Sequence, residues 1–252
     1  MAGTMGGHAM TNMLVTRPEP DCQSTLARLQ ALEIPAQAAA VMVRQTLDVS
    51  LPPPDGFTAM VLTSTNAIRS LDERGVLADY LQLPVFAVGD RTAREAEAVG
   101  FRRVSSAAGA LQDLVNAMAI ARLPGPVFHP TGRYSAGDLA QAVAPLGIMV
   151  VTARIYDMVA VDSLPEDIMA ALKDGRITEV LSYSRRTAEI FAQLTRSLDQ
   201  AQKSRLAMLC LSEAVAEPLL ENHFNRISLA DRPDEDAMMA LALAVAREQT
   251  GS

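Results

Sequence analysis

The chain has 252 residues, of which 49% are hydrophobic, and it carries a formal net charge of −7 at neutral pH. This length allows one large domain or two of ordinary size. The negative charge and the lack of a basic run argue against a nucleic-acid partner, because phosphate neutralisation supplies most non-specific affinity. Charged residues or Pro break the apolar runs before they reach the roughly 20 residues that span a bilayer, so we expect a soluble, cytoplasmic protein without membrane contact.

Residues 1–12 lack a basic segment followed by a long apolar core, so we interpret them as a disordered leader and not as a signal peptide. From residue 13 onward, short apolar runs alternate with helical patterns, which is typical of a parallel sheet flanked by helices. The runs expected to form strands are MLVT (13–16), AMVLTS (59–64), PVFAVG (84–89), PVFHPT (126–131), EVLSYS (179–184) and LAMLCLS (206–212). Helix caps are predicted at residues 63–66, at Asp90 and Thr92, at Ser184 and at Ser212.

Part of this pattern of strands and helices is repeated in the sequence. VLTSTNAIRSL (61–71) followed by VFAVGDRTAREAEAVGF (85–101) matches VLSYSRRTAEI (180–190) followed by LAMLCLSEAVAEPLLENHF (206–224). We interpret the repeat as two similar α/β domains. The alternative is the weak self-similarity of any chain that alternates strands and helices.

Two extended segments, 41–49 and 150–161, lack the pattern of strand, cap and helix. If the first strand and helix belong with the C-terminal copy, residues 13–40 and 161–252 form a discontinuous domain and residues 48–152 form an inserted one. Residues 41–47 and 153–160 then become the linker strands. The predicted fold is α/β: two similar parallel-sheet domains joined by a two-stranded antiparallel linker. A cleft between them would lie at the C-terminal ends of both sheets, where such sheets bind ligands.

The turns after the predicted strands would bring several helix N-termini to this cleft, and helix N-termini bind anions. The same turns contain Arg17, Arg91, Arg133, Arg185 and Arg186. This pattern favours a ligand with several carboxylates or phosphates, although caps and surface arginines also occur in α/β proteins that bind no such ligand.

Several other kinds of site are not supported by the sequence. It has no GxxxxGK(S/T) or GxGxxG nucleotide motif and no GxSxG nucleophile motif. Cys22 and Cys210 lie far apart without a second ligand nearby, so we expect buried, reduced thiols and no metal. His129 and His223 cannot be placed beside a serine. Hydroxyls remain as the candidate reactive groups, and we expect Tyr156 to be the most exposed to the cleft; the alternative is an aromatic side chain that packs the hinge.

Eight segments together resemble a known family. They are LVTRPEPD (14–21), VLTSTNAIRSL (61–71), AVGDRTAREAEAVGF (87–101), HPTGRYSAGDLAQAVAPLGIMV (129–150), RIYDMVAV (154–161), LSYSRRTAEIF (181–191), LCLSEAVAEPL (209–219) and DRPDEDAMMALALAVA (231–246). Their order and spacing over residues 13–247 are similar to those of uroporphyrinogen-III synthases.

The resemblance implies two α/β domains joined by a two-stranded ladder and a substrate rich in carboxylates, the linear tetrapyrrole hydroxymethylbilane. The enzyme would remove the terminal hydroxyl as water, close the macrocycle and invert ring D through a spirocyclic intermediate. The resemblance implies no metal or organic cofactor, and we expect a monomer.

The resemblance also suggests site residues. Tyr156 in RIYD is similar to the family's tyrosine that helps the hydroxyl leave, as a proton donor or a positioner, and Thr92 in VGDRTA matches a polar family position. We expect Tyr156 and Thr92 to be catalytic. Substrate contacts are expected at Thr16, Arg17, Ser64, Thr65, Asn66, Gly89, Asp90, Arg91, Gly132, Arg133, Ser184, Arg185, Arg186 and Ser212. The chain departs from the family at LSEAVA, where Ser212 stands at a glycine position and Val215 at a hydroxyl position.

Two other functions remain open at this stage. A hinged two-domain module that binds a small polyanion without catalysis would share the fold, the caps and the arginines. A nucleotide-dependent α/β enzyme is disfavoured because the phosphate-binding loop is missing.

Overall fold

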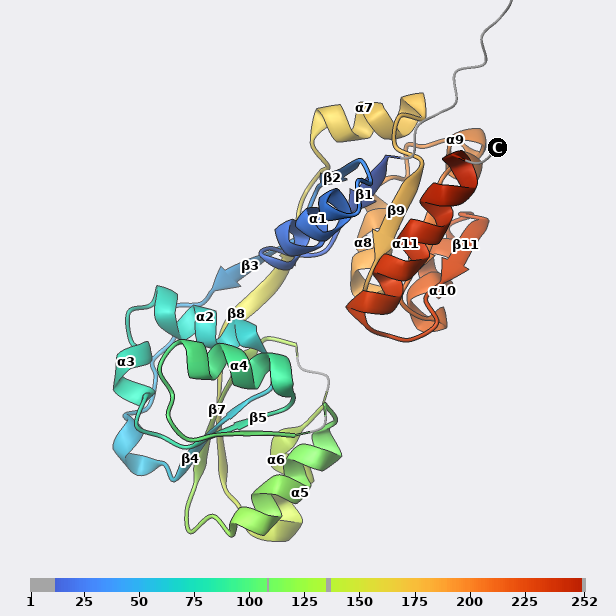
Figure 1. Ribbon diagram of the computed structural model, residues 1–252. Coiled ribbons are helices and arrows are strands. Elements are labelled where there is room, and N and C mark those ends of the chain that lie inside the picture. The colour runs from blue at the N-terminus through green and yellow to red at the C-terminus, as the bar shows by residue number, and fades with distance from the viewer. Residues whose placement is uncertain (1–11, 108, 135–136, 251–252) are drawn as a thin grey trace, which may run out of the picture. The chain divides into compact units, whose positions relative to one another are not determined.

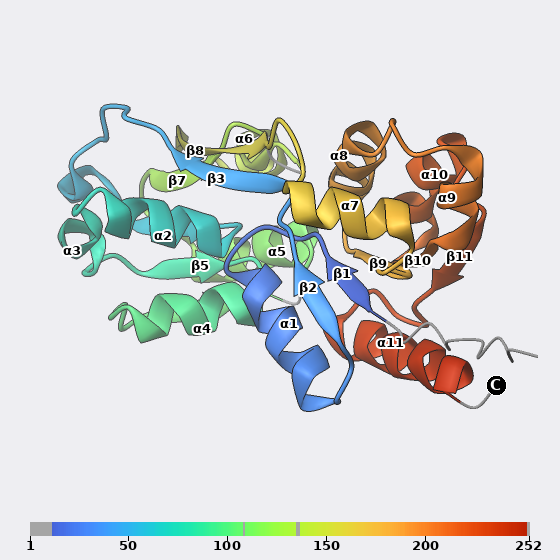
Figure 2. The same ribbon diagram turned by 90° about the horizontal axis from the view of Figure 1, so that it is seen from above.

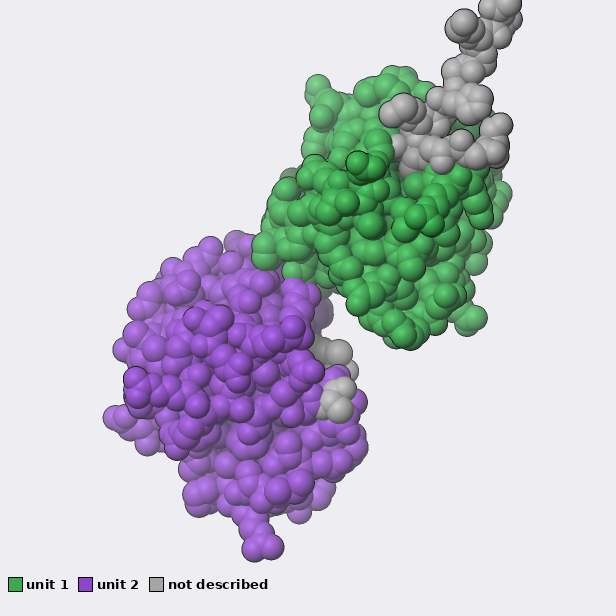
Figure 3. All heavy atoms as spheres, viewed as in Figure 1, with its two compact units in different colours: residues 1–43, 159–252 green, residues 44–158 purple. Residues whose placement is uncertain are grey.

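The computed structural model describes residues 12–107, 109–134 and 137–250. The chain divides into two compact units (Figure 3). We call Arg44–Met158 the inserted unit, and the described residues up to Val43 and from Val159 the split unit. Asn12, which the sequence assigned to the leader, exchanges hydrogen bonds with Thr178 in the split unit. The rest of the predicted leader lies outside the described residues.

The inserted unit is built on a six-stranded sheet, two strands of which extend past the bounds of the unit (Figure 1). In spatial order its strands are β3 (Met42–Thr46), β8 (Val150–Ala160), β7 (Val127–Gly132), β4 (Ala59–Leu62), β5 (Val85–Ala87) and β6 (Val104–Ser106). The five strands from β8 to β6 pair in parallel. Leu47 donates its N–H to Ile155 and Val161 donates to Val41, so the segments that contain β3 and β8 run in opposite directions.

Helices cover both faces of this sheet (Figure 2). Because side chains alternate along a strand, Met60 and Leu62 of β4 face one core while Ala59 and Val61 face the other. The first core is closed by α2 (Thr65–Glu73), α3 (Leu77–Tyr80) and α4 (Asp90–Ala98). The second is closed by α5 (Leu111–Ala121) and α6 (Leu139–Val143), and the 3-10 turns η1 (Pro54–Gly56) and η2 (Ala144–Leu146) complete the unit.

The split unit has a five-stranded parallel sheet. Its order is β11 (Arg226–Leu229), β10 (Ala207–Cys210), β9 (Glu179–Ser182), β1 (Met13–Val15) and β2 (Ala36–Ala38). One core lies under α1 (Asp21–Ala31) and α11 (Glu235–Thr250), through buried residues such as Leu29 and Met238. The remaining helices are α7 (Glu166–Asp174), α8 (Arg185–Leu194), α9 (Gln200–Arg205) and α10 (Glu213–Glu221).

The two sheets have equivalent strand orders. If β9 and β10 are matched to β4 and β5, as the sequence repeat requires, the order β11-β10-β9-β1-β2 corresponds to β6-β5-β4-β7-β8. The prediction of an α/β fold with parallel sheets is confirmed, and each of the six predicted apolar runs contains a strand. The sequence did not predict β2, β6 and β11, because these short strands carry no continuous buried run.

The predicted helix caps are partly wrong. Ser64 and Ser184 do cap α2 and α8, because each hydroxyl oxygen accepts a backbone N–H bond of 3.2 Å from the first turn. Asp90 and Thr92 lie inside the first turn of α4, whose N-cap is Gly89. Ser212 occupies the N-cap position of α10, but its side chain makes no capping hydrogen bond.

Candidate active site

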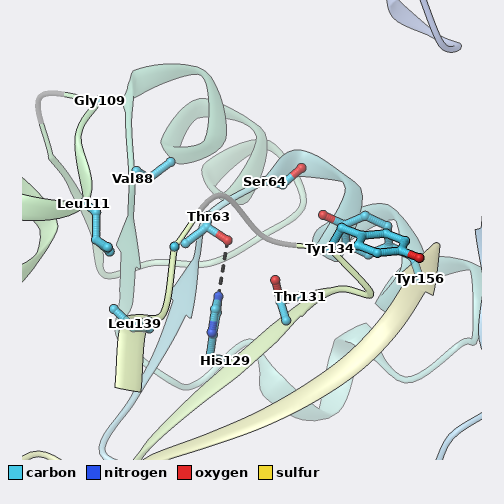
Figure 4. Close-up of a pocket in the computed structure, with 11 residues that line it drawn as sticks. Thr63, Ser64, Val88, Gly109, Leu111, His129, Thr131, Tyr134, Leu139 and Tyr156 are labelled. Atoms are coloured by element: carbon cyan, nitrogen blue, oxygen red, sulfur yellow. Dashed lines mark hydrogen bonds between the residues drawn. The ribbon is translucent and has the colours of Figure 1, made fainter. Parts of the chain in front are cut away.

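A pocket of about 420 Å³ opens within the inserted unit, at the C-terminal ends of its parallel strands (Figure 4). This is the edge at which open parallel sheets bind ligands. The lining residues come from β7, β8 and the turns and helices beside them: Thr63, Ser64, Val88, Gly109, Leu111, His129, Thr131, Tyr134, Gly137, Leu139 and Tyr156. Ser64 and Tyr156 are the predicted site residues among them.

Tyr156 is not exposed, which corrects the sequence-based expectation. Its side chain lies in the wall of the pocket and is only 7% exposed, because β8 runs through the sheet and not along a free surface. Burial raises the pKa of the Tyr156 phenol above its ordinary value. Hydrogen bonding from Ser64 and the Gly132 backbone, and the positive charge of Arg44, act in the opposite direction. The phenol is therefore protonated at neutral pH, and the groups around it would stabilise its anion.

His129 is a second titratable group in this pocket, and sequence reasoning had set it aside. It lies on β7, is 4% exposed, and its Nε2 is 3.2 Å from the hydroxyl oxygen of Thr63 (Figure 4). Burial lowers the pKa of His129 from 6.5 to about 4, although the carboxylate of Asp138 acts to raise it. The imidazole is therefore uncharged at neutral pH.

The turn between β4 and α2 connects these two groups. Two consecutive hydroxyls lie in this turn. The Thr63 hydroxyl forms a hydrogen bond with His129 on β7, and the Ser64 hydroxyl forms one with Tyr156 on β8 that partly opposes the increase in the Tyr156 pKa caused by burial. Ser64 also caps α2, so the turn has a defined conformation before any ligand arrives. The predicted contacts Thr65 and Asn66 form the first turn of α2.

The predicted residues around α4 lie beside the pocket and not in its lining. Val88, from the preceding turn, does line it. Thr92 is buried in the first turn, and Arg91 is exposed there. Asp90 accepts a hydrogen bond of 2.6 Å from the hydroxyl of Ser106, so its carboxylate is already engaged.

Arg133 follows the pocket strand β7 and is held close to Tyr156. Its backbone N–H donates to the Tyr156 carbonyl at 2.8 Å, and its guanidinium lies 3.1 Å from a carboxylate oxygen of Asp157. The other oxygen of Asp157 is buried and has no partner among the described residues. The predicted cation at this position is therefore neutralised by a neighbouring acid.

The remaining predicted contacts belong to the split unit, where acids also engage the arginines. Arg17 pairs with Asp21 at 3.1 Å and with Glu235, and it lies 4.2 Å from the centroid of the Tyr183 ring. Glu235 also accepts a hydrogen bond from Tyr183. This cluster joins the start of α11 to α1 and to the turn after β9.

Four more predicted contacts also lie in the split unit. The hydroxyl of Thr16 is buried and donates to the Leu181 carbonyl at 2.9 Å. Arg185 pairs with Glu189 and Glu217 on the surface. Arg186 is half-buried in the first turn of α8, and Ser212 lies at the start of α10. The predicted contacts are thus divided between the two units.

Other kinds of site are not found in the described part of the chain. No group of three or more His, Cys, Asp or Glu residues there could hold a metal ion. Cys22 and Cys210 are free and buried, as the sequence predicted. Within the same residues, no helix is both long and apolar enough to cross a membrane.

A family profile described as uroporphyrinogen-III synthase HemD matches residues 27–240. The chain belongs to the uroporphyrinogen-III synthase family. It is therefore a cyclising lyase of porphyrin biosynthesis, and the family suggested by the sequence is confirmed. No curated protein sequence matches the chain.

Solved structures of uroporphyrinogen-III synthases have the same fold. The crystal structure of the enzyme from Helicobacter pylori is 17% identical, with a TM-score of 0.67 over 94% of this chain and 100% of that one. A mutant enzyme from the extremely thermophilic bacterium Thermus thermophilus is 16% identical, with a TM-score of 0.51 over 95% of this chain and 99% of that one.

In this synthase the pocket adds Thr63, His129, Thr131 and Tyr134 to the candidate residues. One signal for them was present in the sequence. Side chains two apart in a strand share a face, so His129 and Thr131 follow Val127 on one face of β7, as Thr63 follows Val61. The sequence does not show that β4 pairs with β7, which places these side chains of the two strands next to each other.

Proposed function

We propose that this synthase converts hydroxymethylbilane to uroporphyrinogen III, with loss of water and inversion of ring D. The observation that carries the proposal is the Tyr156 phenol: a buried, protonated acid in the wall of a ligand-sized pocket at the edge of a parallel sheet. It is the kind of group that departure of a hydroxyl requires.

In the first step the Tyr156 phenol donates its proton to the hydroxyl oxygen of the substrate. The C–O bond breaks and water leaves, while the adjacent pyrrole nitrogen supplies the electron pair. The phenolate that forms is stabilised by Ser64, the Gly132 N–H and the charge of Arg44, which oppose the effect of burial on its pKa. A ring D carbon that already bears the bridge to ring C attacks the cation and forms the spirocyclic intermediate, and the bond from ring D to that bridging carbon then breaks. The freed bridging carbon bonds to the unsubstituted ring D carbon, which loses a proton and so restores the phenol directly or through water.

The rest of the task is to control the shape of the substrate. The free tetrapyrrole can also close without inversion, so the enzyme must hold the chain where the inverting attack is faster, and proximity can supply such a bias. We propose that the substrate's carboxylates bind at helix N-termini of both units, in the cleft that the sequence predicts. The N-caps of these helices are Ser64, Gly89, Ser184 and Ser212.

Several finer expectations belong to this proposal. Thr92 is a second catalytic residue, residues 41–47 and 153–160 serve as linker strands between the predicted domains, and the enzyme works as a cytoplasmic monomer. Family membership favours catalysis over a module that only binds a polyanion.

The test is an assay with freshly generated hydroxymethylbilane, in which the type III and type I products are separated after oxidation. Type III product in proportion to enzyme concentration supports the proposal. Type I product alone, formed at the rate seen without enzyme, contradicts it and leaves binding without catalysis as the function.

A further inference from the structure

The pocket in the inserted unit has an uncharged lining. The described residues that line it include no Asp, Glu, Lys or Arg, and its one histidine is neutral at physiological pH. Val88, Leu111 and Leu139 form apolar walls. A carboxylate placed here would lose its hydration without gaining a counter-charge, which is unfavourable. The interior of the pocket therefore suits an uncharged ring, and the substrate's carboxylates belong outside it.

His129 gives this apolar space one directional polar group. Its Nε2 interacts with Thr63, while its Nδ1 has no hydrogen-bond partner among the described residues. In a neutral imidazole one nitrogen donates and the other accepts. If Nε2–H donates to the Thr63 hydroxyl oxygen, Nδ1 is left as an acceptor that can take a hydrogen bond from a ligand. The N–H of a pyrrole ring is a suitable donor.

We propose that this pocket holds the pyrrole ring that bears the hydroxymethyl group, and that the ring donates its N–H to His129. The inference rests on the proposed function and adds a second residue to it. Tyr156 and His129 line the same pocket, so one ring can meet both. The phenol acts on the departing oxygen and the imidazole on the ring nitrogen.

Such a bond would become stronger during the reaction. When the hydroxyl leaves, the pyrrole nitrogen supplies the electron pair and takes on positive charge, which makes its N–H a better donor. An acceptor that is already oriented stabilises this state more than the starting state, and this difference is what accelerates a reaction. An imidazolium would lack the acceptor and would repel the developing cation. The low pKa of His129 keeps the acceptor available at neutral pH.

The experiment compares two small probes, a monopyrrole with one acetate and one propionate side chain and its N-methyl analogue, which has no N–H to donate. We expect the wild-type protein to bind the N–H probe about tenfold more tightly, as for one neutral hydrogen bond. His129→Leu should bind the two probes equally, and His129→Gln, which keeps an acceptor, should retain part of the preference. Thr63→Val removes the partner that holds Nε2 as the donor, so it should reduce the preference without abolishing it. Circular dichroism and thermal unfolding check that each variant is folded.

The second readout is the nitrogen chemical shift of histidine in protein labelled with ¹⁵N-histidine. His129→Gln identifies the His129 signals, and we expect only the N–H probe to shift Nδ1. Equal binding of the two probes to wild type, a preference that persists in His129→Leu, no binding of either probe, or an unchanged Nδ1 signal would each overturn the inference. If one of these results is obtained but type III product still forms in the hydroxymethylbilane assay, only the inference about the pocket is wrong and the proposed function stands. If no type III product forms, the proposed function fails as well.

Discussion

Gly132 lies so close to the ring of Tyr156 that a Cβ added to Gly132 would come within 2.8 Å of Cε2 and 3.2 Å of the phenol oxygen. The two residues pair across β7 and β8 at a register shift between Thr131 and Gly132. What the glycine supplies here is space, because its φ lies outside the positive range that favours glycine. The position of the Tyr156 phenol therefore depends on residue 132 being a glycine.

Substituting Gly132 by alanine should displace the Tyr156 ring and lower kcat. A displacement of about 1 Å in a reacting group lowers rates by up to about 100-fold, so we expect a loss of about 10- to 100-fold. Gly56→Ala is the matched control, since a Cβ there meets nothing within 4 Å. Wild-type turnover by Gly132→Ala would show that the position of Tyr156 does not limit the reaction.

His129 should make stability depend on pH in a defined window. Its pKa is 6.5 when unfolded and about 4 when folded. The unfolded chain therefore binds more protons between these values, and the His129 contribution is fully present above about pH 6.5 and is lost as the pH falls to about 4. The loss should be on the order of 3 kcal/mol.

The measurement is the free energy of unfolding by urea, monitored by circular dichroism, at about pH 7 and at about pH 4.5. This interval covers most of the pH range in which the His129 contribution is lost. His129→Gln lacks the titrating group, so its stability should fall less than that of wild type over this interval. Equal pH dependence in the two proteins would mean that His129 is not buried in its neutral form.

The Arg17 side chain should contribute more to the free energy of unfolding than an exposed arginine such as Arg185 does. Its side chain is only 15% exposed and engages Asp21, Glu235 and the Tyr183 ring. Arg17→Met leaves Glu235 without its cation, and because Glu235 keeps some contact with solvent we expect a loss of about 2 kcal/mol. Arg185→Met is the control and should change little, since that side chain is 48% exposed. If Arg17→Met unfolds like wild type but raises KM, Arg17 is chiefly a substrate ligand.

Two serines at equivalent helix starts should differ in their effect on stability. Ser184 accepts the N–H of Thr187, whereas Ser212 makes no side-chain capping bond. Ser184→Ala should therefore lower the free energy of unfolding by about 1 kcal/mol. Ser212→Ala should stay within about 0.5 kcal/mol of wild type. Equal losses in the two variants would refute the assignment of the caps.

The sequence predicts those parts of the fold whose signals lie in residues close together along the chain. Buried parallel strands appear as apolar runs, and Ser64 and Ser184 mark helix starts, because these signals depend on neighbouring residues. The edge strands β6 and β11 were missed because edge strands carry exposed side chains. Ser212 was predicted to be a cap because the residue type suits one, but the type does not determine the rotamer.

The site was predicted less completely, for a physical reason. Tyr156 was singled out as a candidate hydroxyl and the family resemblance suggested its role, but its burial follows from packing that no local pattern describes. His129 and Thr63 are 66 positions apart and meet only because β4 pairs with β7. The arginines were recognised as cations, whereas the acids that neutralise them, such as Glu235 for Arg17, come from distant parts of the chain.

The central claim is that the chemistry depends on the phenol of Tyr156 in the pocket of the inserted unit. Its most direct test is the yield of type III product from hydroxymethylbilane for wild type, Tyr156→Phe and Tyr134→Phe, the last being the other tyrosine of the same pocket. We predict a large loss of type III product for Tyr156→Phe and a smaller one for Tyr134→Phe. Wild-type yield and rate from folded Tyr156→Phe would contradict the account.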